Sequence, residues 1–166
     1  MKISYAKKDD LTEIVAIYNQ AIKAGLNTAD TETFSVKDRL EWYDAHNPDQ
    51  YPLLVAKEDN IILGYLTISA YRYGRKALKH TAEISYYIHF SHHRKGVGTE
   101  LMNKALELCP SLKIKTLIAI LIGCNQASIG ILKKNGFKEW GCMPNIVEFK
   151  SGSYNHLYYG LTLRKD

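Results

Sequence analysis

The sequence predicts a mixed α+β fold, organised as one domain over residues 1–166, with a central sheet flanked by helices. Residues 81–90 alternate apolar and polar side chains, as a half-buried strand does. Residues 97–108 instead repeat apolar side chains at helical spacing. No repeat, low-complexity segment or Pro/Gly-rich linker divides the chain, and a hydrophobic content of 46% is sufficient for one folded core.

The first part of the chain is expected to contain a short strand and two helices. The strand is predicted at residues 3–6. The run Asp10-Leu11-Thr12-Glu13 resembles a capping box and predicts the start of the first helix. Residues 28–34 should form a loop, and the amphipathic run 35–46 predicts the second helix.

The rest of the chain adds strands around two further helices. The apolar runs 52–57 and 61–70 flank a polar three-residue turn and predict a hairpin. Residues 114–121 indicate a buried strand, and the helix predicted at residues 125–135 ends at a glycine. Two late strands are expected, near residues 137–143 and 156–163. Hairpin and crossover connections therefore both occur.

Composition excludes several functional classes. The net charge of +5 comes from basic residues spread along the chain, with no Lys/Arg run interleaved with aromatics, so no nucleic-acid partner is expected. No run of about 18 apolar residues occurs, so no membrane partner is expected. The N-terminus lacks a signal-peptide core, and the three cysteines have no CxxC spacing, which together favour a cytoplasmic location. His89, His92 and His93 lack acidic or cysteine neighbours at ligand spacing, so no metal is expected.

The turn His93-Arg94-Lys95-Gly96-Val97-Gly98 lies between a predicted strand and a predicted helix. Free N–H groups and the positive end of a helix dipole favour an anion at such a position. Gly96 and Gly98 let the backbone approach a phosphate closely. The sequence therefore predicts a phosphorylated cofactor here, and an ordinary glycine-bearing strand–helix turn is the alternative.

Three local patterns in this order resemble the GNAT acetyltransferase superfamily over nearly the whole chain. They are the turn at residues 93–98, the helix opening Gly123-Cys124-Asn125-Gln126-Ala127-Ser128, and the helix end Lys134-Asn135-Gly136-Phe137. Further runs resemble the phosphinothricin and methionine-sulfone acetyltransferase branch. They are Ile17-Tyr18-Asn19, Tyr51 to Ala56, Gly64-Tyr65, Arg75-Lys76-Ala77, Thr81 to His89 and Glu148-Phe149-Lys150.

The resemblance implies acetyl-CoA as donor, a mixed sheet splayed open near its middle with the cofactor in the gap, and a homodimer. The cofactor contacts that it implies are Tyr87, Ile88, His89, His93, Arg94, Lys95, Gly96, Val97, Gly98, Thr99, Asn125 and Ser128. Backbone groups of Tyr87 and Ile88 would pair with the pantetheine arm. An ordinary core strand, and a plain N-cap formed by Asn125 with Ser128, are the alternatives.

Glu83 is the predicted catalytic residue, because it matches the family's general base. An ammonium group must lose a proton before its nitrogen attacks a thioester, and a desolvated carboxylate can accept that proton. Alternation places Glu83 on one strand face with Ser85 and Tyr87. The alternative is a solvent-facing or salt-bridged carboxylate, with Arg75 or Lys79 as its partner.

One departure from the family concerns the general acid. Relatives carry Tyr or His at the position of Leu132, and leucine cannot donate a proton. Solvent can protonate a thiolate, whose reference pKa is about 8.5. The tyrosines Tyr86, Tyr87 and Tyr154 are the candidate substitutes.

Arginine and aromatic side chains are the candidates for the acceptor pocket. Arg75 aligns with the family's Arg-x-Ala element, and arginine suits a carboxylate. The other candidates are Phe34, Arg72 and Tyr73, then Trp42, Lys150 and Tyr154. Core packing is the alternative for Trp42.

The function expected from this resemblance is transfer of acetyl from acetyl-CoA to the primary amine of a small molecule. An amino acid or analogue is the expected acceptor, and the amine attacks directly in a ternary complex. Two alternatives stay open. One is a non-catalytic acyl-CoA-binding sensor, which Leu132 favours and Glu83 opposes. The other is an enzyme of the same family that acts on a protein or polyamine amine.

Overall fold

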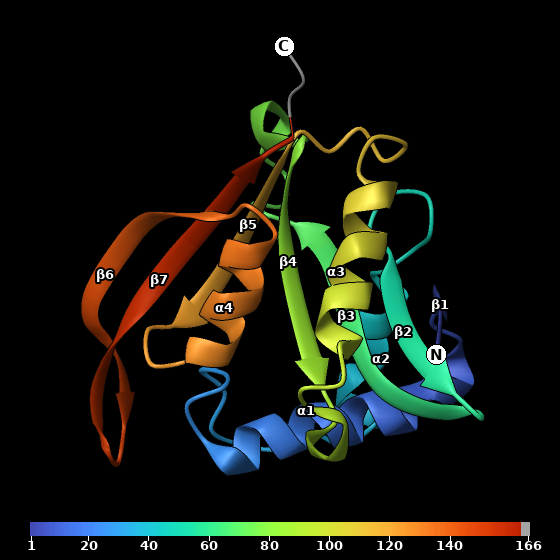
Figure 1. Ribbon diagram of the computed structural model, residues 1–166, viewed down its shortest axis with the longest axis horizontal. Coiled ribbons are helices and arrows are strands. Elements are labelled where there is room, and N and C mark those ends of the chain that lie inside the picture. The colour runs from blue at the N-terminus through green and yellow to red at the C-terminus, as the bar shows by residue number, and fades with distance from the viewer. Residues whose placement is uncertain (164–166) are drawn as a thin grey trace.

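The computed structural model describes residues 1–163, and its helices and strands follow the predicted order (Figure 1). The strands are β1 Lys2–Tyr5, β2 Leu53–Glu58, β3 Ile61–Ala70, β4 Thr81–Ile88, β5 Thr116–Ile122, β6 Lys138–Phe149 and β7 Gly152–Thr162. The helices are α1 Leu11–Ala24, α2 Leu40–Asp44, α3 Val97–Leu108 and α4 Gln126–Lys134. Short 3-10 turns occupy Lys8–Asp10, Lys37–Arg39, Lys76–Leu78 and Phe90–His92.

Two sequence-based expectations about the helices need correction. The predicted helix at residues 35–46 is a 3-10 turn, Lys37–Arg39, followed by the short α2. The predicted capping box does not form. Asp10 accepts a hydrogen bond from the N–H of Lys7 at 2.8 Å, because a 3-10 turn precedes α1. Glu13 instead accepts from the N–H of Ile62 at 3.0 Å and so ties α1 to the start of β3.

The seven strands form one mixed sheet in the order β1-β2-β3-β4-β5-β7-β6. Among the strands of residues 1–163 only β4 and β5 run parallel, and their pairing covers just Thr81 to Glu83 against Thr116 to Ile118. Beyond Glu83 the two strands diverge, as Figure 1 shows. The splayed, mixed sheet expected from the resemblance is therefore confirmed, and the splay leaves one edge of β4 without a neighbouring strand.

Helices cover both faces of the sheet. The larger core cluster joins α3 and α4 to one face, where Leu101, Met102 and Leu132 are fully buried. A smaller cluster joins α1 to the other face through Ile14, Ile17 and the neighbouring strands. Each large apolar side chain buried in this way stabilises the fold by about 1.5–3 kcal/mol. Within residues 1–163 no helix is both long and apolar enough to span a bilayer.

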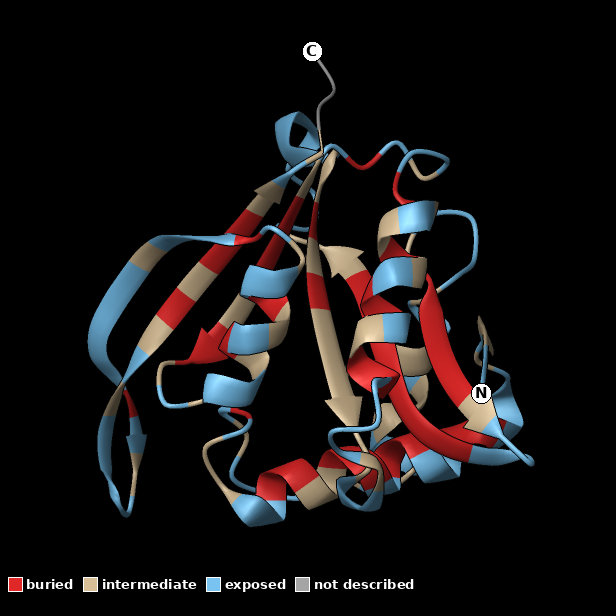
Figure 2. Cartoon of the chain, viewed as in Figure 1, coloured by how far each residue is buried: buried red, intermediate tan, exposed pale blue. Residues whose placement is uncertain are grey.

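β6 and β7 form a hairpin that is longer than the sequence predicted. Residues 156–162 of β7 pair with the whole of β5, and β7 carries the sheet outward to β6. β6 is exposed along most of its length, as Figure 2 shows. Its outward apolar side chains are Trp140, Met143 and Ile146, which are 51%, 44% and 56% exposed. The alternation used to recognise half-buried strands is therefore weak here.

Candidate active site

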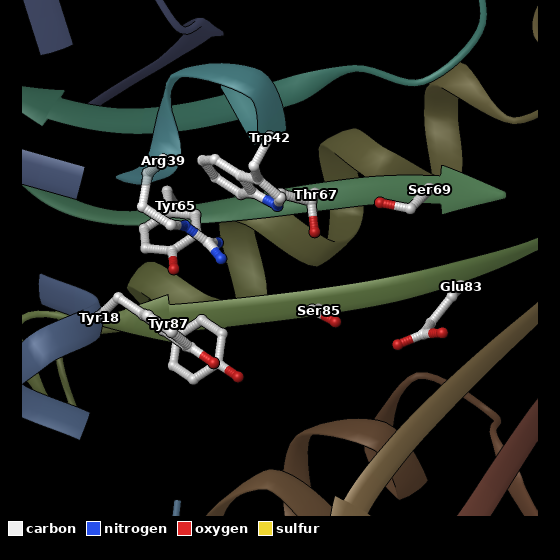
Figure 3. Close-up of a pocket in the computed structure, with 9 residues that line it drawn as sticks. All are labelled: Tyr18, Arg39, Trp42, Tyr65, Thr67, Ser69, Glu83, Ser85 and Tyr87. Atoms are coloured by element: carbon white, nitrogen blue, oxygen red, sulfur yellow. The ribbon is translucent and has the colours of Figure 1, made fainter. Parts of the chain in front are cut away.

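A cavity of about 280 Å³ lies on the face of β3 and β4 that α1 and α2 cover. β3 and β4 supply its floor, because alternate residues of each strand point to this face. Tyr18 comes from α1, while Arg39 and Trp42 come from the segment of the 3-10 turn and α2 (Figure 3). The strand residues that line it are Tyr65, Thr67, Ser69, Glu83, Ser85 and Tyr87.

Glu83 supplies the carboxylate of this cavity. It lies opposite Ser69 in the β3–β4 register, at the end of the cavity away from Arg39 (Figure 3). In the described part of the chain its side chain has no hydrogen-bond or salt-bridge partner, and the alternative partners Arg75 and Lys79 are exposed. Burial raises the pKa of Glu83 above its ordinary value, since desolvation disfavours the charged form. The predicted strand face is confirmed.

His46 orients the hydroxyl that lies opposite Glu83. Its Nδ1 is 2.7 Å from the carbonyl oxygen of Trp42, and its Nε2 is 3.1 Å from Ser69 Oγ. A carbonyl only accepts, so Nδ1 carries the proton in neutral His46 and Nε2 accepts from Ser69. Burial lowers the pKa of His46 and favours this neutral form. The lone pairs of Ser69 are then free to accept a hydrogen bond from a ligand in the cavity.

The other end of the cavity is aromatic and carries a cation. The guanidinium of Arg39 lies 4.1 Å from the ring centre of Trp42 and 5.1 Å from that of Tyr18. Tyr87 meets the Tyr18 ring edge-on, with 4.8 Å between centroids. Burial raises the pKa of Tyr87, so its hydroxyl keeps its proton at neutral pH. This end therefore offers cationic and neutral donors, whereas the Glu83 end offers an acceptor.

Side chains of α1 pin the predicted loop at residues 28–34 against this aromatic end. Asn19 donates to the carbonyl of Phe34 at 2.8 Å and accepts from its N–H at 3.0 Å. The hydroxyl of Tyr18 is 2.9 Å from Thr28 Oγ1 and also donates to Asp30. Phe34 lies against Tyr18, with ring centroids 6.0 Å apart, and it supports the cavity wall from behind.

A second cavity, of about 50 Å³, lies in the gap where β4 and β5 diverge. The N–H of His89 donates to the carbonyl of Leu63 in β3 at 2.9 Å. In an antiparallel ladder successive residues face opposite sides, so the peptide groups of Tyr86 and Ile88 point away from β3 and into the gap. The expectation for Ile88 fits this geometry. The peptide group of Tyr87 faces β3, but the residue lines both cavities, so its contact with the cofactor stays a prediction.

The side chain of Tyr86 joins the two sides of this gap. Its hydroxyl lies 2.6 Å from Ser128 Oγ and donates to the Ser128 carbonyl at 3.2 Å. Both residues line the smaller cavity. Burial raises the pKa of Tyr86 to about 12, so the hydroxyl remains a donor at neutral pH.

The basic turn has the geometry of an anion cradle at the end of the gap. Gly96, with φ of 82°, is the N-cap of α3, and Arg94 also adopts a positive φ of 60°. Among residues 1–163 no acceptor is found for the N–H groups of residues 97–99, which point out of the helix start. A Cβ on Gly98 would lie 3.0 Å from Ile131, so this position suits glycine. Unpaired N–H donors at a helix start, with no side chain on Gly98, fit a pyrophosphate.

His93 is held back from this cradle. Its Nε2 donates to the carbonyl of Ile88 at 3.0 Å, and its ring packs 5.1 Å from that of Phe90. The peptide N–H groups and the exposed side chains of Arg94 and Lys95 are thus the donors that the turn offers to an anion. No group of three His, Cys, Asp or Glu residues in the described chain could hold a metal ion.

Comparison with known proteins identifies the family of this chain. Residues 13–137 match the profile of the acetyltransferase (GNAT) family. The chain belongs to the GNAT acetyltransferase family. It is therefore an N-acetyltransferase by family, with the fold and turn that the resemblance predicted.

Individual relatives of this GNAT protein agree with that assignment. YwnH of Bacillus subtilis (strain 168), provisionally named a phosphinothricin acetyltransferase, is 38% identical over 93% of this chain and 94% of its own. An L-methionine sulfoximine/L-methionine sulfone acetyltransferase of Salmonella typhimurium (strain LT2) is 30% identical over 88% of this chain and 85% of its own. The structure of yncA from Salmonella typhimurium with its cofactor acetyl-CoA superimposes with a TM-score of 0.94, at 27% identity over 100% of this chain and 95% of that one.

Asn125, the residue before α4, and Leu132, within it, both have structural roles in this GNAT protein. Asn125 is the N-cap of α4, with its side-chain oxygen accepting from the N–H of Ser128 at 3.1 Å, and it also lines the smaller cavity. The capping alternative is thus confirmed, and a cofactor contact stays a prediction. Leu132, at the position where the resemblance implies a general acid, is fully buried in the larger core cluster.

Several predicted acceptor residues lie away from the cavity. Arg72, Tyr73 and Arg75 belong to the exposed loop between β3 and β4, and Tyr73 is 93% exposed. Tyr154 lies in the β6–β7 hairpin, where it donates to Ser151 at 3.1 Å. The expectation that these residues form the pocket wall needs correction, because the loop extends beyond the end of β3.

Sequence reasoning missed residues that do line the cavity. Arg39 is the charged residue among them, whereas Trp42, a pocket candidate with core packing as its alternative, does line the cavity. A signal was present in β3, where Thr67 and Ser69 interrupt an apolar run at period two. Two polar residues on one face of an otherwise buried strand indicate a wet cavity above that face.

Proposed function

We propose that this GNAT protein transfers acetyl from acetyl-CoA to the primary amine of a small amino acid or analogue, by direct attack in a ternary complex. The observation that carries the proposal is the relation of the two cavities. Ser85 and Tyr87 line both of them, so the acceptor cavity with Glu83 and the gap with its exposed peptide groups meet across one strand. An amine and a thioester bound on the two sides would therefore be neighbours.

The chain's own residues supply binding, deprotonation and charge stabilisation. Acetyl-CoA supplies the activated thioester carbonyl, and residues 94–99 hold its phosphates. Glu83 accepts the proton of the acceptor ammonium, directly or through water, as the N–C bond forms and the C–S bond breaks. Gap-facing N–H groups of β4 stabilise the negative charge on the carbonyl oxygen. Tyr86, whose single O–H donates to Ser128 in this structure, would turn that O–H to the departing sulfur, a role that the buried Leu132 cannot fill.

The shape of the acceptor cavity supports a small acceptor over the two larger ones. A volume of about 280 Å³ suits an amino acid rather than a protein segment. Glu83 is the single carboxylate among its nine lining residues, whereas a polyamine presents several cations. The desolvated Glu83 also argues against a sensor that performs no chemistry.

Thiol release from acetyl-CoA tests this proposal. The purified protein is mixed with acetyl-CoA and, separately, with methionine sulfone, phosphinothricin, free amino acids, spermidine and a short peptide. Release that requires an amino acid or analogue supports the proposal. Tight acetyl-CoA binding without release on any amine favours the sensor, and release with spermidine or peptide alone favours the larger acceptors. Cytoplasmic location and a homodimer also remain predictions, and light scattering tests the dimer.

A further inference from the structure

The strongest unassigned feature of the acceptor cavity is the cation at its aromatic end. Within residues 1–163, Arg39 forms no salt bridge and no side-chain hydrogen bond. The neighbouring acid Asp38 accepts instead from the N–H and hydroxyl of Ser35, at 2.8 and 2.6 Å. Asp30, on the facing loop, accepts from the hydroxyl of Tyr18. Arg39 thus brings a positive charge to the cavity that no described carboxylate neutralises.

Aromatic rings hold this charge in place without using its donors. The guanidinium lies 4.1 Å from the ring centre of Trp42, 5.1 Å from Tyr18 and 5.2 Å from Phe34. Ring faces attract the cation but do not accept its in-plane N–H bonds. The planar fork of N–H donors therefore remains free for a ligand, and its shape matches a carboxylate. In Figure 3 the guanidinium points into the cavity.

Glu83 occupies the opposite end, so the cavity has a fixed polarity. Figure 3 shows Arg39 and Glu83 at its two ends, with the hydroxyls of Thr67 and Ser85 between them. A ligand that carries both charges would neutralise both ends at once. An α-amino acid is such a zwitterion: with its carboxylate on Arg39, its ammonium would point toward Glu83 and reach it through water, since both groups are bonded to one carbon. A simple alkylamine would leave the Arg39 end unneutralised.

From this polarity, and resting on the proposed function, we infer that Arg39 binds the α-carboxylate of the acceptor and restricts the enzyme to amino-acid zwitterions. Arg39 is then a specificity residue that orients the amine toward Glu83. The loop residue Arg75, which the sequence suggested for this task, is exposed and does not line the cavity. A site built around a charged ligand group rejects analogues that lack it, because its own polar groups are left unpaired.

The test compares acceptors that differ only in the carboxylate. Methionine sulfone is paired with 3-(methylsulfonyl)propylamine, its decarboxylated counterpart, and kcat/KM is measured for each with wild type, Arg39→Met and Arg39→Lys. In the wild type we expect a ratio of about 10²-fold or more in favour of the amino acid. In Arg39→Met the ratio should fall to within about threefold of one, and Arg39→Lys should lie between them. Lys37→Met, on the same turn but exposed, is the matched control and keeps the wild-type ratio.

Each other result counts against the inference. If Arg39→Met slows both acceptors equally, Arg39 only supports the aromatic stack. If the methionine variant does not fold, Arg39→Lys, which keeps the charge, and Arg39→Gln replace it. If both of these variants retain the full ratio, the same conclusion follows. If phosphinothricin loses activity on removal of its phosphinate but not its carboxylate, the anion on Arg39 is the side-chain one. If the wild type transfers acetyl but its ratio is near one, the inference about Arg39 fails and the proposed function stands. If no amine supports release, the proposed function fails with it.

Discussion

Replacing Glu83 by glutamine tests the centre of the proposed mechanism. Glutamine keeps the size of the side chain and its place opposite Ser69, but it cannot accept a proton. The change leaves the turn at residues 94–99 untouched, so acetyl-CoA affinity should stay within about threefold of wild type. Turnover should fall, because the acceptor ammonium must lose its proton to water instead.

The size of the effect follows from what else lines the cavity. Loss of a general base typically lowers the rate by about 10²–10⁴-fold. The remaining lining residues are hydroxyls, tyrosines, a tryptophan and Arg39. Burial raises the pKa of the lining tyrosines, so none of them takes over as base. The loss should therefore lie near the middle of the range, about 10³-fold, which corresponds to roughly 4 kcal/mol of barrier.

The assay is thiol release at saturating acetyl-CoA with methionine sulfone, measured across pH. Because burial raises the pKa of Glu83, the wild-type rate should rise with pH through a range above that of an ordinary carboxyl. Glutamine at position 83 should abolish this limb. Glu41→Gln, an exposed change on α2, is the control and should retain wild-type turnover. A Glu83→Gln rate within threefold of wild type would refute the assignment.

Stability gives an independent readout of the same substitution. A carboxyl whose pKa is raised on folding binds its proton more tightly in the folded state. Its charge therefore destabilises the fold fully above the raised pKa, and not at all below the ordinary value. Glu83→Gln should raise the melting temperature at pH 7, and the gain should vanish as the pH falls to 4. A lower melting temperature at pH 7 would mean that the charge has a stabilising partner.

Three further substitutions address the turn, the gap and the core. Gly96→Ala should lower the free energy of unfolding by about 1–2 kcal/mol, seen as a melting temperature about 2–8 °C lower. The added Cβ contacts no other residue, so the whole cost comes from the left-handed backbone at this position. An unchanged melting temperature would contradict the left-handed turn. Tyr86→Phe should lower kcat about 10²-fold with acetyl-CoA affinity nearly unchanged. Ser128→Ala keeps the hydroxyl of Tyr86 and serves as control. Equal kcat values for Tyr86→Phe and wild type would remove Tyr86 from the mechanism. Leu132→Ala should lower the free energy of unfolding in urea by about 2–5 kcal/mol, and a loss below 1 kcal/mol would show that Leu132 is not a core residue.

The features of the site that depend on local pattern could be predicted from the sequence. Alternation alone placed Glu83, Ser85 and Tyr87 on one face, since strand periodicity is a local property. The cavity around Arg39 could not be predicted in this way. Arg39 lies on a 3-10 turn with no period, and the rings that hold it come from separate segments. Only the packing of α1, the loop at residues 28–34 and α2 brings them together.

The fold shows the same division between local and long-range information. Strands and helices with one buried face, such as β4 and α3, were predicted nearly to their ends. β6 was predicted too short, because most of its residues are exposed and its register is set by pairing with β7. The helix expected at residues 35–46 breaks into a turn and a short helix, because the side chains there pack against the cavity rather than along one continuous stripe.

Because part of one edge of β4 has no neighbouring strand, the stability of the protein should depend on how much acetyl-CoA is available to bind there. In the described chain the sheet has seven strands, and one side of β4 beyond Glu83 has no strand beside it. In the proposed function a donor arm would lie there, and it would then act as a removable strand that closes the sheet. A ligand present at 100 times its dissociation constant adds about 2.7 kcal/mol to the folded state. When acetyl groups are scarce, this half of the molecule should open more often to proteases, and enzyme abundance would then follow metabolic state.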